Sequence, residues 1–468
     1  MEFIQSLQTK DVTTENGMAT NSSSFNRCLD LFFTIGALRG ANPERILKFF
    51  VRAFYENRTA ALRILFWSRD VIDGAGERNT FRIIFKWLCE NHPDTVIKNL
   101  DYVDYLGRWD DILVGIGSKC EDAICDKIKE SLEDGHQLCA KWMPRKGKVA
   151  NILRKKFKMT PKEYRKLLVS NTNVVETKMC AKKWSDIDYS KLPSLAMSRY
   201  GNAFKRNDLV HYMEYFEKLK EGKVKINAKA VYPYDIVKNL RKGNSDLAQE
   251  QWNSLPNYMA ECHDLVFPLV DVSGSMDTPI GNNPNLTAMD VAISLGLYIS
   301  ERNLGPFKDH FMTFSSKPEL VHTSGPLADR LFQMESSNWG NNTNLIAVFS
   351  TLLKQAKENG VRACDMPTKI LILSDMEFDQ ALGNPKNTAM EEIENSYREY
   401  NYTLPKIVFW NIQSRGNNFP VSFNKQGAAL VSGFSPSILK SVLKMDVANP
   451  HKVMLDTINS EKYLGINP

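Results

Sequence analysis

The chain has 468 residues, of which 43% are hydrophobic and 24% charged, so it has enough apolar side chains for packed cores and is not a disordered protein. No run approaches the roughly 18 consecutive apolar residues of a membrane span, and the polar first 24 residues lack the apolar segment of a secretory signal. Eight scattered cysteines do not suggest a disulfide framework. We therefore expect a cytoplasmic protein, or a nuclear one, with two or three domains and no membrane partner.

The net charge of +6 is divided unevenly along the chain. Residues 1–255 contain 43 Lys and Arg against 32 Asp and Glu, whereas residues 256–468 contain 17 against 22. The two parts should therefore meet different partners.

The first part of the chain predicts a helical array. Residues 1–24 are polar and are expected to form a flexible tail. Over 25–255 apolar residues recur at helical spacing, as in the stripe of Phe49, Phe50, Ala53 and Phe54, and glycine or proline separates the runs. This pattern predicts an all-α module over 25–255, without a clean fixed-period repeat.

After Pro256 the pattern changes to alternating strands and helices. Short apolar runs predict strands, and helical stretches lie between them. This alternation predicts a doubly wound, Rossmann-like α/β domain with a mostly parallel sheet over 256–468. The expected strands are 265–270, 310–314, 369–373 and 407–410, and the expected helices lie near 286–302, 344–358 and 388–400.

Oxygen-bearing side chains follow two of these strands and precede one helix. Asp271, Ser273 and Ser275 follow the strand 265–270, Asp375 ends the strand 369–373, and Thr343 opens the helix near 344. Such loops meet at the carboxyl edge of a parallel sheet, and oxygen ligands suit a hard cation such as Mg²⁺. In order and context the five residues resemble the metal-ion-dependent adhesion site of von Willebrand factor A domains. That resemblance implies bound Mg²⁺, or another divalent cation such as Mn²⁺ or Ca²⁺, and a partner protein whose acidic residue completes the metal shell.

Other readings of the same residues and of the cysteines are weaker. The segment lacks the Gly-x-Ser-x-Gly of a hydrolase elbow, and no set of histidine, acid and nucleophile can be assembled, so we expect no enzyme. Cys120, Cys125, His136 and Cys139 lack a close CxxC pair, which favours buried thiols over a zinc site.

A dense basic segment lies in the helical part. Residues 141–183 hold 14 Lys and Arg against two acids. Trp142, Phe157 and Tyr164 lie among them, and Trp184 follows directly. Cations neutralise phosphates and exposed aromatic rings stack on unpaired bases, which favours single-stranded RNA as the ligand. A solvated basic face with its aromatic rings in the core, or a membrane-surface contact, remains the alternative. The candidate RNA-binding residues are Lys141, Arg145, Lys146, Lys148, Arg154, Lys155, Lys156, Lys158, Lys162, Arg165 and Lys166.

Short motifs in series connect the two parts to one family. They are Thr14–Gly17, Leu29–Phe33, Ala37–Arg39, Arg69–Arg78, Gly107–Asp111, Val175–Met179, Trp184, Pro193–Ser194, Ala203–Phe204 and Asp375–Asp379. With the metal motif, they make nearly the whole chain resemble the Ro ribonucleoproteins and, more closely, a large group of Ro-like proteins. The resemblance implies a TROVE-type module of HEAT-like repeats that forms a ring closed by the A domain. In Ro the outside of that ring binds structured noncoding RNA and its central hole binds single-stranded RNA ends.

Together these observations predict a non-enzymatic scaffold for noncoding, misfolded or single-stranded RNA, whose A domain binds a metal and an acidic partner. The alternative is a protein-assembly or structural adaptor that uses the A domain without RNA. Segments 69–78 and 107–111 could face the hole of a ring; equally, Asp70, Arg78 and Arg108 could form ion pairs between helices.

Overall fold

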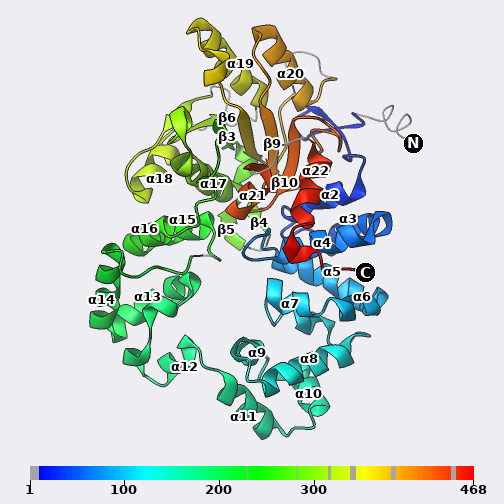
Figure 1. Ribbon diagram of the computed structural model, residues 1–468, viewed down its shortest axis with the longest axis vertical. Coiled ribbons are helices and arrows are strands. Elements are labelled where there is room, and N and C mark those ends of the chain that lie inside the picture. Colours follow the sequence, from blue (N-terminus) through cyan, green and yellow to red (C-terminus); the bar gives the residue numbers. More distant parts are fainter. Residues whose placement is uncertain are drawn as a thin grey trace.

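A computed structural model of the chain describes residues 10–228, 230–281, 283–314, 318–337, 344–380, 386–443 and 449–468. A helical half is followed by a mixed α/β half (Figure 1). None of the helices within these ranges is long and apolar enough to cross a bilayer.

The helical half consists of short α-helices that follow one another from Arg27 to Asn253. They are α2 (Arg27–Ile35), α3 (Pro43–Glu56), α4 (Arg58–Arg69), α5 (Arg78–Asn91), α6 (Pro93–Lys98), α7 (Asp101–Leu106), α8 (Glu121–Glu133), α9 (Gln137–Trp142), α10 (Gly147–Lys156), α11 (Pro161–Asn171), α12 (Val175–Cys180), α13 (Ser194–Asn207), α14 (Leu209–Lys220), α15 (Pro233–Arg241) and α16 (Ser245–Asn253).

Local sequence explains where several of these helices begin. The Asn42 side chain accepts from the Glu44 amide, and Pro43 occupies the first turn of α3, where its missing N–H costs nothing. Thr160 and Glu163 form a reciprocal capping box at the start of α11. Such side chains bind the backbone amides that the first turn of a helix leaves unpaired, so the sequence itself determines where α3 and α11 begin.

The α/β half is built on a six-stranded sheet. Its strand order is β10-β9-β8-β3-β6-β7, parallel except for the antiparallel edge strand β7. The strands are β3 (Val266–Asp271), β6 (His310–Phe314), β7 (Leu320–His322), β8 (Lys369–Ser374), β9 (Lys406–Asn411) and β10 (Ala428–Ser432), with a separate hairpin of β4 (Pro279–Ile280) and β5 (Asn283–Thr287).

Helices cover this sheet and connect it to the helical half. Helix α17 packs against β3, β6 and β8, α19 against β6, and α22 against β10. The predicted doubly wound α/β unit is therefore confirmed, with four strands and three helices close to the expected ranges and β7 and β10 in addition. The helices of this half are α17 (Ala288–Arg302), α18 (Leu327–Glu335), α19 (Leu345–Glu358), α20 (Ala389–Tyr400), α21 (Leu439–Leu443) and α22 (Pro450–Ile458).

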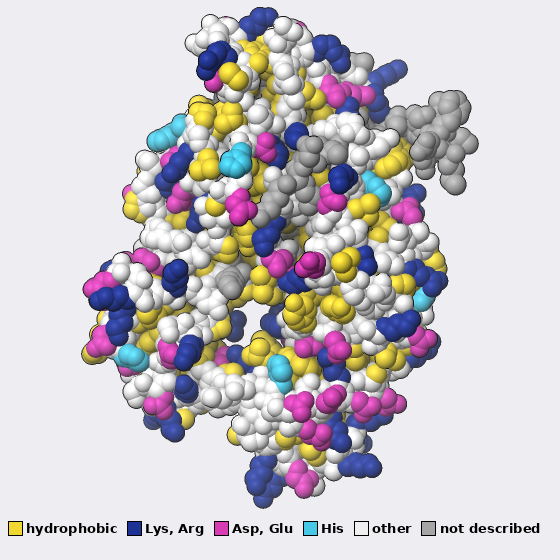
Figure 2. All heavy atoms as spheres, in the orientation of Figure 1, with side chains coloured by type: hydrophobic (Ala, Val, Ile, Leu, Met, Phe, Trp, Pro, Cys, Tyr) yellow, Lys and Arg dark blue, Asp and Glu magenta, His cyan; other side chains and the backbone are white. Residues whose placement is uncertain are grey.

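The helical half touches the α/β half at both of its ends. Near its beginning, α2 packs against β10 and α22, and α4 packs against α22. At its other end α15 packs against α17, and α16 against α18. Between these seams α5–α14 curve away from the sheet and return to it (Figure 1), and the space-filling view shows an opening between them (Figure 2). The result is a ring that the α/β half closes.

Polar contacts reinforce the second seam. Arg241 of α15 pairs with Asp290 of α17 and, at 2.6 Å, with Glu335 of α18. The guanidinium of Arg302 donates to the carbonyl of Trp252 at 2.6 Å. Charge and packing therefore fix the same orientation of α15 and α16.

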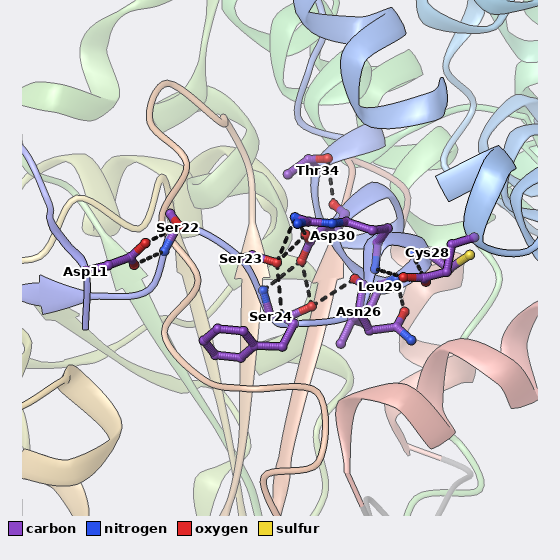
Figure 3. A network of polar contacts seen from close by, with 12 residues as sticks. Asp11, Ser22, Ser23, Ser24, Asn26, Cys28, Leu29, Asp30 and Thr34 are labelled. Carbon is purple, nitrogen blue, oxygen red and sulfur yellow. Dashed lines mark hydrogen bonds and ion pairs between the residues drawn. The ribbon is translucent and has the colours of Figure 1, made fainter. Parts of the chain in front are cut away.

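Helix α2 is buried almost completely because both halves cover it. Its carboxylate Asp30 is 3% exposed and accepts hydrogen bonds from the Ser23 hydroxyl at 2.6 Å and from the Ser24 amide and hydroxyl at 2.7 and 2.6 Å (Figure 3). Burial raises the pKa of Asp30 although these donors oppose the shift. A buried carboxylate requires such partners, so the serine run preceding α2 has a structural role.

The segment expected to be a flexible tail, 1–24, is packed from residue 10 onward. Strands β1 (Val12–Thr13) and β2 (Ala19–Thr20) pair with each other, and bridges join Gly17 to Asp379 and Asn21 to Phe419. Met18 is 2% exposed. Polar composition alone suggested disorder, but these residues exchange hydrogen bonds with loops of the α/β half, which a local pattern does not reveal.

A buried ion pair holds the inner helices together. The guanidinium of Arg69 lies 2.6 Å from the Asp111 carboxylate, and their side chains are 2% and 0% exposed. Arg82 donates to the other oxygen of Asp111 at 2.6 Å. Asp111 thus joins α4 and α5 to the loop after α7.

We expect Asp111→Ala to lower the free energy of unfolding by about 3–5 kcal/mol, because it leaves Arg69 as a buried, unpaired charge. Urea denaturation followed by circular dichroism measures the loss. Asp101→Ala is the control, since its side chain is 92% exposed and pairs with Lys127; such surface pairs contribute about 1 kcal/mol or less. Equal losses in the two variants would contradict the structural role of Asp111.

Candidate functional site

The sequence-predicted metal ligands lie on neighbouring parallel strands. Asp271 ends β3, Ser273 and Ser275 follow it in the turn of a short 3-10 helix, and Asp375 directly follows β8. Because β3 and β8 are hydrogen-bonded to each other, their carboxyl ends meet at one edge of the sheet. Thr343 lies outside the described residues.

Hydrogen bonds orient Asp271 and its serines. The Ser374 hydroxyl donates to one carboxylate oxygen of Asp271 at 2.6 Å, and the Ser273 amide donates to the other at 3.0 Å. The hydroxyl oxygens of Ser273 and Ser275 are 3.0 Å apart. The turn therefore brings two hydroxyl groups together beside a fixed carboxylate.

Asp375 has a cationic partner that the sequence did not predict. The Arg415 guanidinium donates to Asp375 Oδ2 at 2.7 Å and also to the backbone carbonyl of Ser275. Its other nitrogen lies 3.7 Å from the carboxylate of Glu15 in the N-terminal segment. Arg415 lies in the loop after β9, forty residues from Asp375, and carries no recognisable motif.

The two buried carboxylates of this cluster, Asp271 and Asp375, are balanced by only one cation among the described residues, Arg415. Asp271 is 0% and Asp375 2% exposed. Burial, with a contribution from the charge of Asp375, raises the pKa of Asp271 to about 7. Burial also raises the pKa of Asp375, although Arg415 opposes the shift. A bound cation would relieve this unfavourable charge.

The donor chemistry of the cluster fits a hard divalent cation. Its oxygens come from two carboxylates and two hydroxyls, which Mg²⁺ prefers over nitrogen or sulfur. No group of three or more His, Cys, Asp or Glu side chains suited to a metal occurs within the described ranges. A metal at this edge would therefore be held by Asp271, Ser273, Ser275 and Asp375, with hydroxyl oxygens as essential members.

The cysteines of the rejected zinc reading are buried thiols. Cys120, Cys125 and Cys139 are each 2% exposed or less. Burial raises the pKa of the Cys125 thiol to about 11 and that of Cys139 to about 12. Such thiols stay protonated at neutral pH and act as apolar packing groups.

The candidate RNA-binding residues lie on and between α9, α10 and α11. Two of them pair with acids: Lys141 lies 3.1 Å from Glu176, and Lys156 contacts Asp122. The others form no ion pair with any residue that the structure describes, and most are exposed: Arg145, Lys146, Lys148, Arg154, Lys155, Lys158, Lys162, Arg165 and Lys166.

The aromatic residues of the basic segment differ from the expected stacking platform. Phe157 and Tyr164 are 6% and 1% exposed and pack together with ring centroids 6.2 Å apart. Trp142 is half-buried and carries the Arg108 guanidinium 3.8 Å above its ring. Phe157, which caps the end of α10, and Tyr164 of α11 are therefore core residues, as the alternative interpretation proposed.

The two readings of segments 69–78 and 107–111 each hold for part of the residues. Asp70 accepts from the Tyr463 hydroxyl at 2.8 Å and pairs with Lys462 at 2.5 Å, so it belongs to an ion-pair network. Arg108 also forms an ion pair, with Asp110, and Arg78 forms none with the described residues. Both line a cavity of about 770 Å³ between the two halves, together with Arg39, Tyr232 and Tyr234.

Comparisons with known proteins cover almost the whole chain. A family model described as "Domain of unknown function (DUF7788)" matches residues 266–463. A mimivirus protein, "Uncharacterized protein L728" of Acanthamoeba polyphaga mimivirus, is 28% identical over 516 residues, covering 97% of this chain and 88% of that protein. The crystal structure of the Deinococcus radiodurans RO (RSR) protein is 12% identical and covers 93% of this chain and 99% of that chain, with a TM-score of 0.41.

A second family model matches the helical half. It is described as "Domain of unknown function (DUF2828)" and covers residues 14–106 and 120–265, about half of the chain. The two models meet between residues 265 and 266, where β3 begins, ten residues beyond the boundary expected from sequence. The chain therefore belongs to the DUF2828 family.

Proposed function

We propose that this protein is a non-enzymatic scaffold that binds single-stranded or structured noncoding RNA through its helical half. The observation that carries the proposal is the set of nine basic side chains between Arg145 and Lys166 without an ion pair among the described residues. Surface cations that lack protein counter-ions favour a polyanion, because they release its condensed ions on contact.

The ring supports the same proposal. The larger cavity has Arg39, Arg78 and Arg108 in its wall; Arg39 and Arg108 pair with Glu77 and Asp110, so Arg78 is the cation there without an ion pair among the described residues. This arrangement agrees with what the resemblance to the Ro ribonucleoproteins implies. A single strand is the nucleic acid whose width suits such a cavity.

We also propose that the α/β half binds Mg²⁺ through Asp271, Ser273, Ser275, Thr343 and Asp375 and presents it to an acidic residue of a partner protein. Support comes from two observations: the described ligands meet at one edge of the sheet, and the two buried carboxylates have raised pKa values that a bound cation would lower. When bound, the cation would supply an electrophilic position for a carboxylate, and the residues of this chain would hold it.

An adaptor without RNA is the second candidate. It is favoured by exposed apolar side chains at the start of α14, where Leu209, Val210 and Met213 are 55%, 74% and 45% exposed. Such patches often mark protein contacts. A pull-down treated with ribonuclease separates the candidates, because an adaptor keeps its partners and an RNA scaffold loses those that RNA connects.

We expect the triple variant Lys155→Glu, Lys158→Glu, Lys162→Glu to bind single-stranded RNA more weakly at every sequence. The slope of the logarithm of the binding constant against the logarithm of the salt concentration should become shallower by about 2, since each phosphate contact on a single strand contributes about 0.7 to that slope. Fluorescence anisotropy titrations at about 50 to 300 mM KCl measure both the affinity for RNA and its dependence on salt.

The matched control for this triple variant reverses three lysines near the end of α14: Lys218, Lys220 and Lys223. Lys220 and Lys223 already pair with Glu217 and Glu221. The control changes the net charge by the same amount as the first triple variant and leaves the basic segment intact. Similar losses of affinity in both triple variants would mean that only the total charge matters. If neither the variants nor the parent bound RNA, the RNA proposal would be overturned.

We expect Asp271→Asn and Asp375→Asn each to abolish Mg²⁺ binding measured by titration calorimetry, because each removes a negative ligand. Asp277→Asn is the control: Asp277 is exposed and lies two residues beyond Ser275 in the same turn. Heat of binding that is unchanged in Asp271→Asn would refute the proposed site.

We expect Arg415→Gln to tighten Mg²⁺ binding roughly tenfold, equivalent to about 1.4 kcal/mol. The guanidinium occupies one oxygen of Asp375 and repels a second cation nearby. The same calorimetric titration measures the change. Weaker binding in Arg415→Gln would instead show that Arg415 holds Asp375 in its ligand orientation.

A further inference from the structure

A smaller cavity lies beside the loop that follows α7. It has a volume of about 320 Å³, and its walls include Tyr105, Trp109, His136 and Trp142 together with Arg108. The residues come from α7, from the loop after it and from the start and end of α9. Four aromatic rings and one guanidinium around one cavity form an environment suited to a flat, polarisable ligand.

The rings of this cavity differ in their roles. Trp109 is 4% exposed and lies 5.2 Å from the His136 ring between centroids, so it forms the floor. Tyr105 is 67% exposed, and its ring makes no aromatic contact with the part of the chain that the structure describes. An exposed tyrosine beside a buried aromatic floor leaves a ring face free for stacking.

Arg108 is already arranged for stacking. Its guanidinium lies 3.8 Å over the Trp142 ring, and Asp110 accepts from its Nε at 2.7 Å. These two contacts hold the planar group in place. A pre-ordered guanidinium loses little conformational entropy when a second flat group stacks on it.

His136 adds a polar group to the wall. Its Nδ1 accepts from the Cys139 amide at 3.2 Å, as the N-cap of α9. In the neutral ring the proton is therefore on Nε2, which has no protein partner among the described residues. A nucleobase offers carbonyl or ring-nitrogen acceptors for such a donor.

A cation without a counter-ion lies next to the cavity. Arg78 begins α5, is exposed, and forms no hydrogen bond or ion pair with any described residue. The larger cavity that it lines shares Gly107 and Arg108 with the aromatic one. Arg82 and Arg108, by contrast, pair with Asp110 at 2.8 Å or closer. Arg78 is thus the cation available for a phosphate.

We propose that this aromatic cavity binds one unstacked nucleobase, with Arg78 contacting the attached phosphate. The inference rests on the proposed RNA-binding function and names a site for one nucleotide within it. Of the residues involved, only Trp142 lies in the basic segment 141–183, and it is not one of the candidate lysines and arginines, so the site is separate from the phosphate-binding surface proposed above.

Adenosine monophosphate tests the cavity directly, with ribose 5-phosphate as a ligand that has the phosphate but no base. Trp109 and Trp142 report binding through their fluorescence. We expect the nucleotide to quench this emission saturably and ribose 5-phosphate to leave it unchanged. Equal binding of the two ligands would overturn the proposal, because it would show recognition of phosphate alone.

Tyr105→Ala should weaken nucleotide binding about 5- to 150-fold, the range expected for one lost stacking partner. Tyr55→Ala is the matched control, since Tyr55 is 66% exposed and lies on α3, away from the cavity. Tyr105→Phe should retain binding because it keeps the ring. Unchanged binding in Tyr105→Ala would overturn the proposal.

The same variants applied to a twelve-nucleotide single-stranded RNA distinguish this inference from the proposed function. Arg78→Gln should weaken RNA binding, whereas Arg52→Gln, an exposed charge on α3, should not. RNA bound equally by the parent, Tyr105→Ala and Arg78→Gln would refute the cavity and leave the scaffold standing. Nucleotide bound in the cavity by a parent that binds no RNA would support the cavity and refute the scaffold.

Discussion

Closure of the ring through the α/β half is the constraint on which the other features depend. The helical array meets the sheet at α2 and again at α15 and α16, so its curvature is set by the distance between these two seams. The larger cavity takes residues from both seams, for example Arg39 on one side and Tyr232 on the other. A ring open at either seam would lose the shape of that cavity even if each helix remained folded.

The distribution of ion pairs separates structural charges from those free for a ligand. Arg69 is buried and Arg39 is half-buried, and they pair with Asp111 and Glu77 at 2.6 Å, as charges removed from water require. The lysines of α10 and α11 are mostly exposed and, apart from Lys156, have no acidic partner in the described ranges. In the sequence the structural arginines and the exposed lysines are both simply charged residues. Only the packing of the folded protein shows which of them are paired with acids.

The order of elements was predictable because strands and helices leave local patterns. The strands β3, β6, β8 and β9 are apolar runs of the expected length, but β10 is alanine-rich and has little strand propensity. The carboxylate and hydroxyl cluster could be predicted for the same local reason. Arg415 could not, since its contact with Asp375 depends on how two loops approach each other. The inward direction of Phe157 and Tyr164 likewise depends on tertiary packing.

The N-terminal segment binds parts of the chain that lie far from it in the sequence. Thr14 donates to the carbonyl of Phe378 at 2.6 Å, and the amide of Phe419 donates to the carbonyl of Asn21 at 3.0 Å. Helix α2 packs on β10 and α22, which lie near the other end of the sequence. Helix α2 also packs against α3 and α4, but during translation the part of its apolar surface that β10 and α22 cover stays exposed until these elements have left the ribosome. The final burial of α2 therefore follows the synthesis of β10 and α22, and until then its exposed apolar residues are a surface that a chaperone would protect.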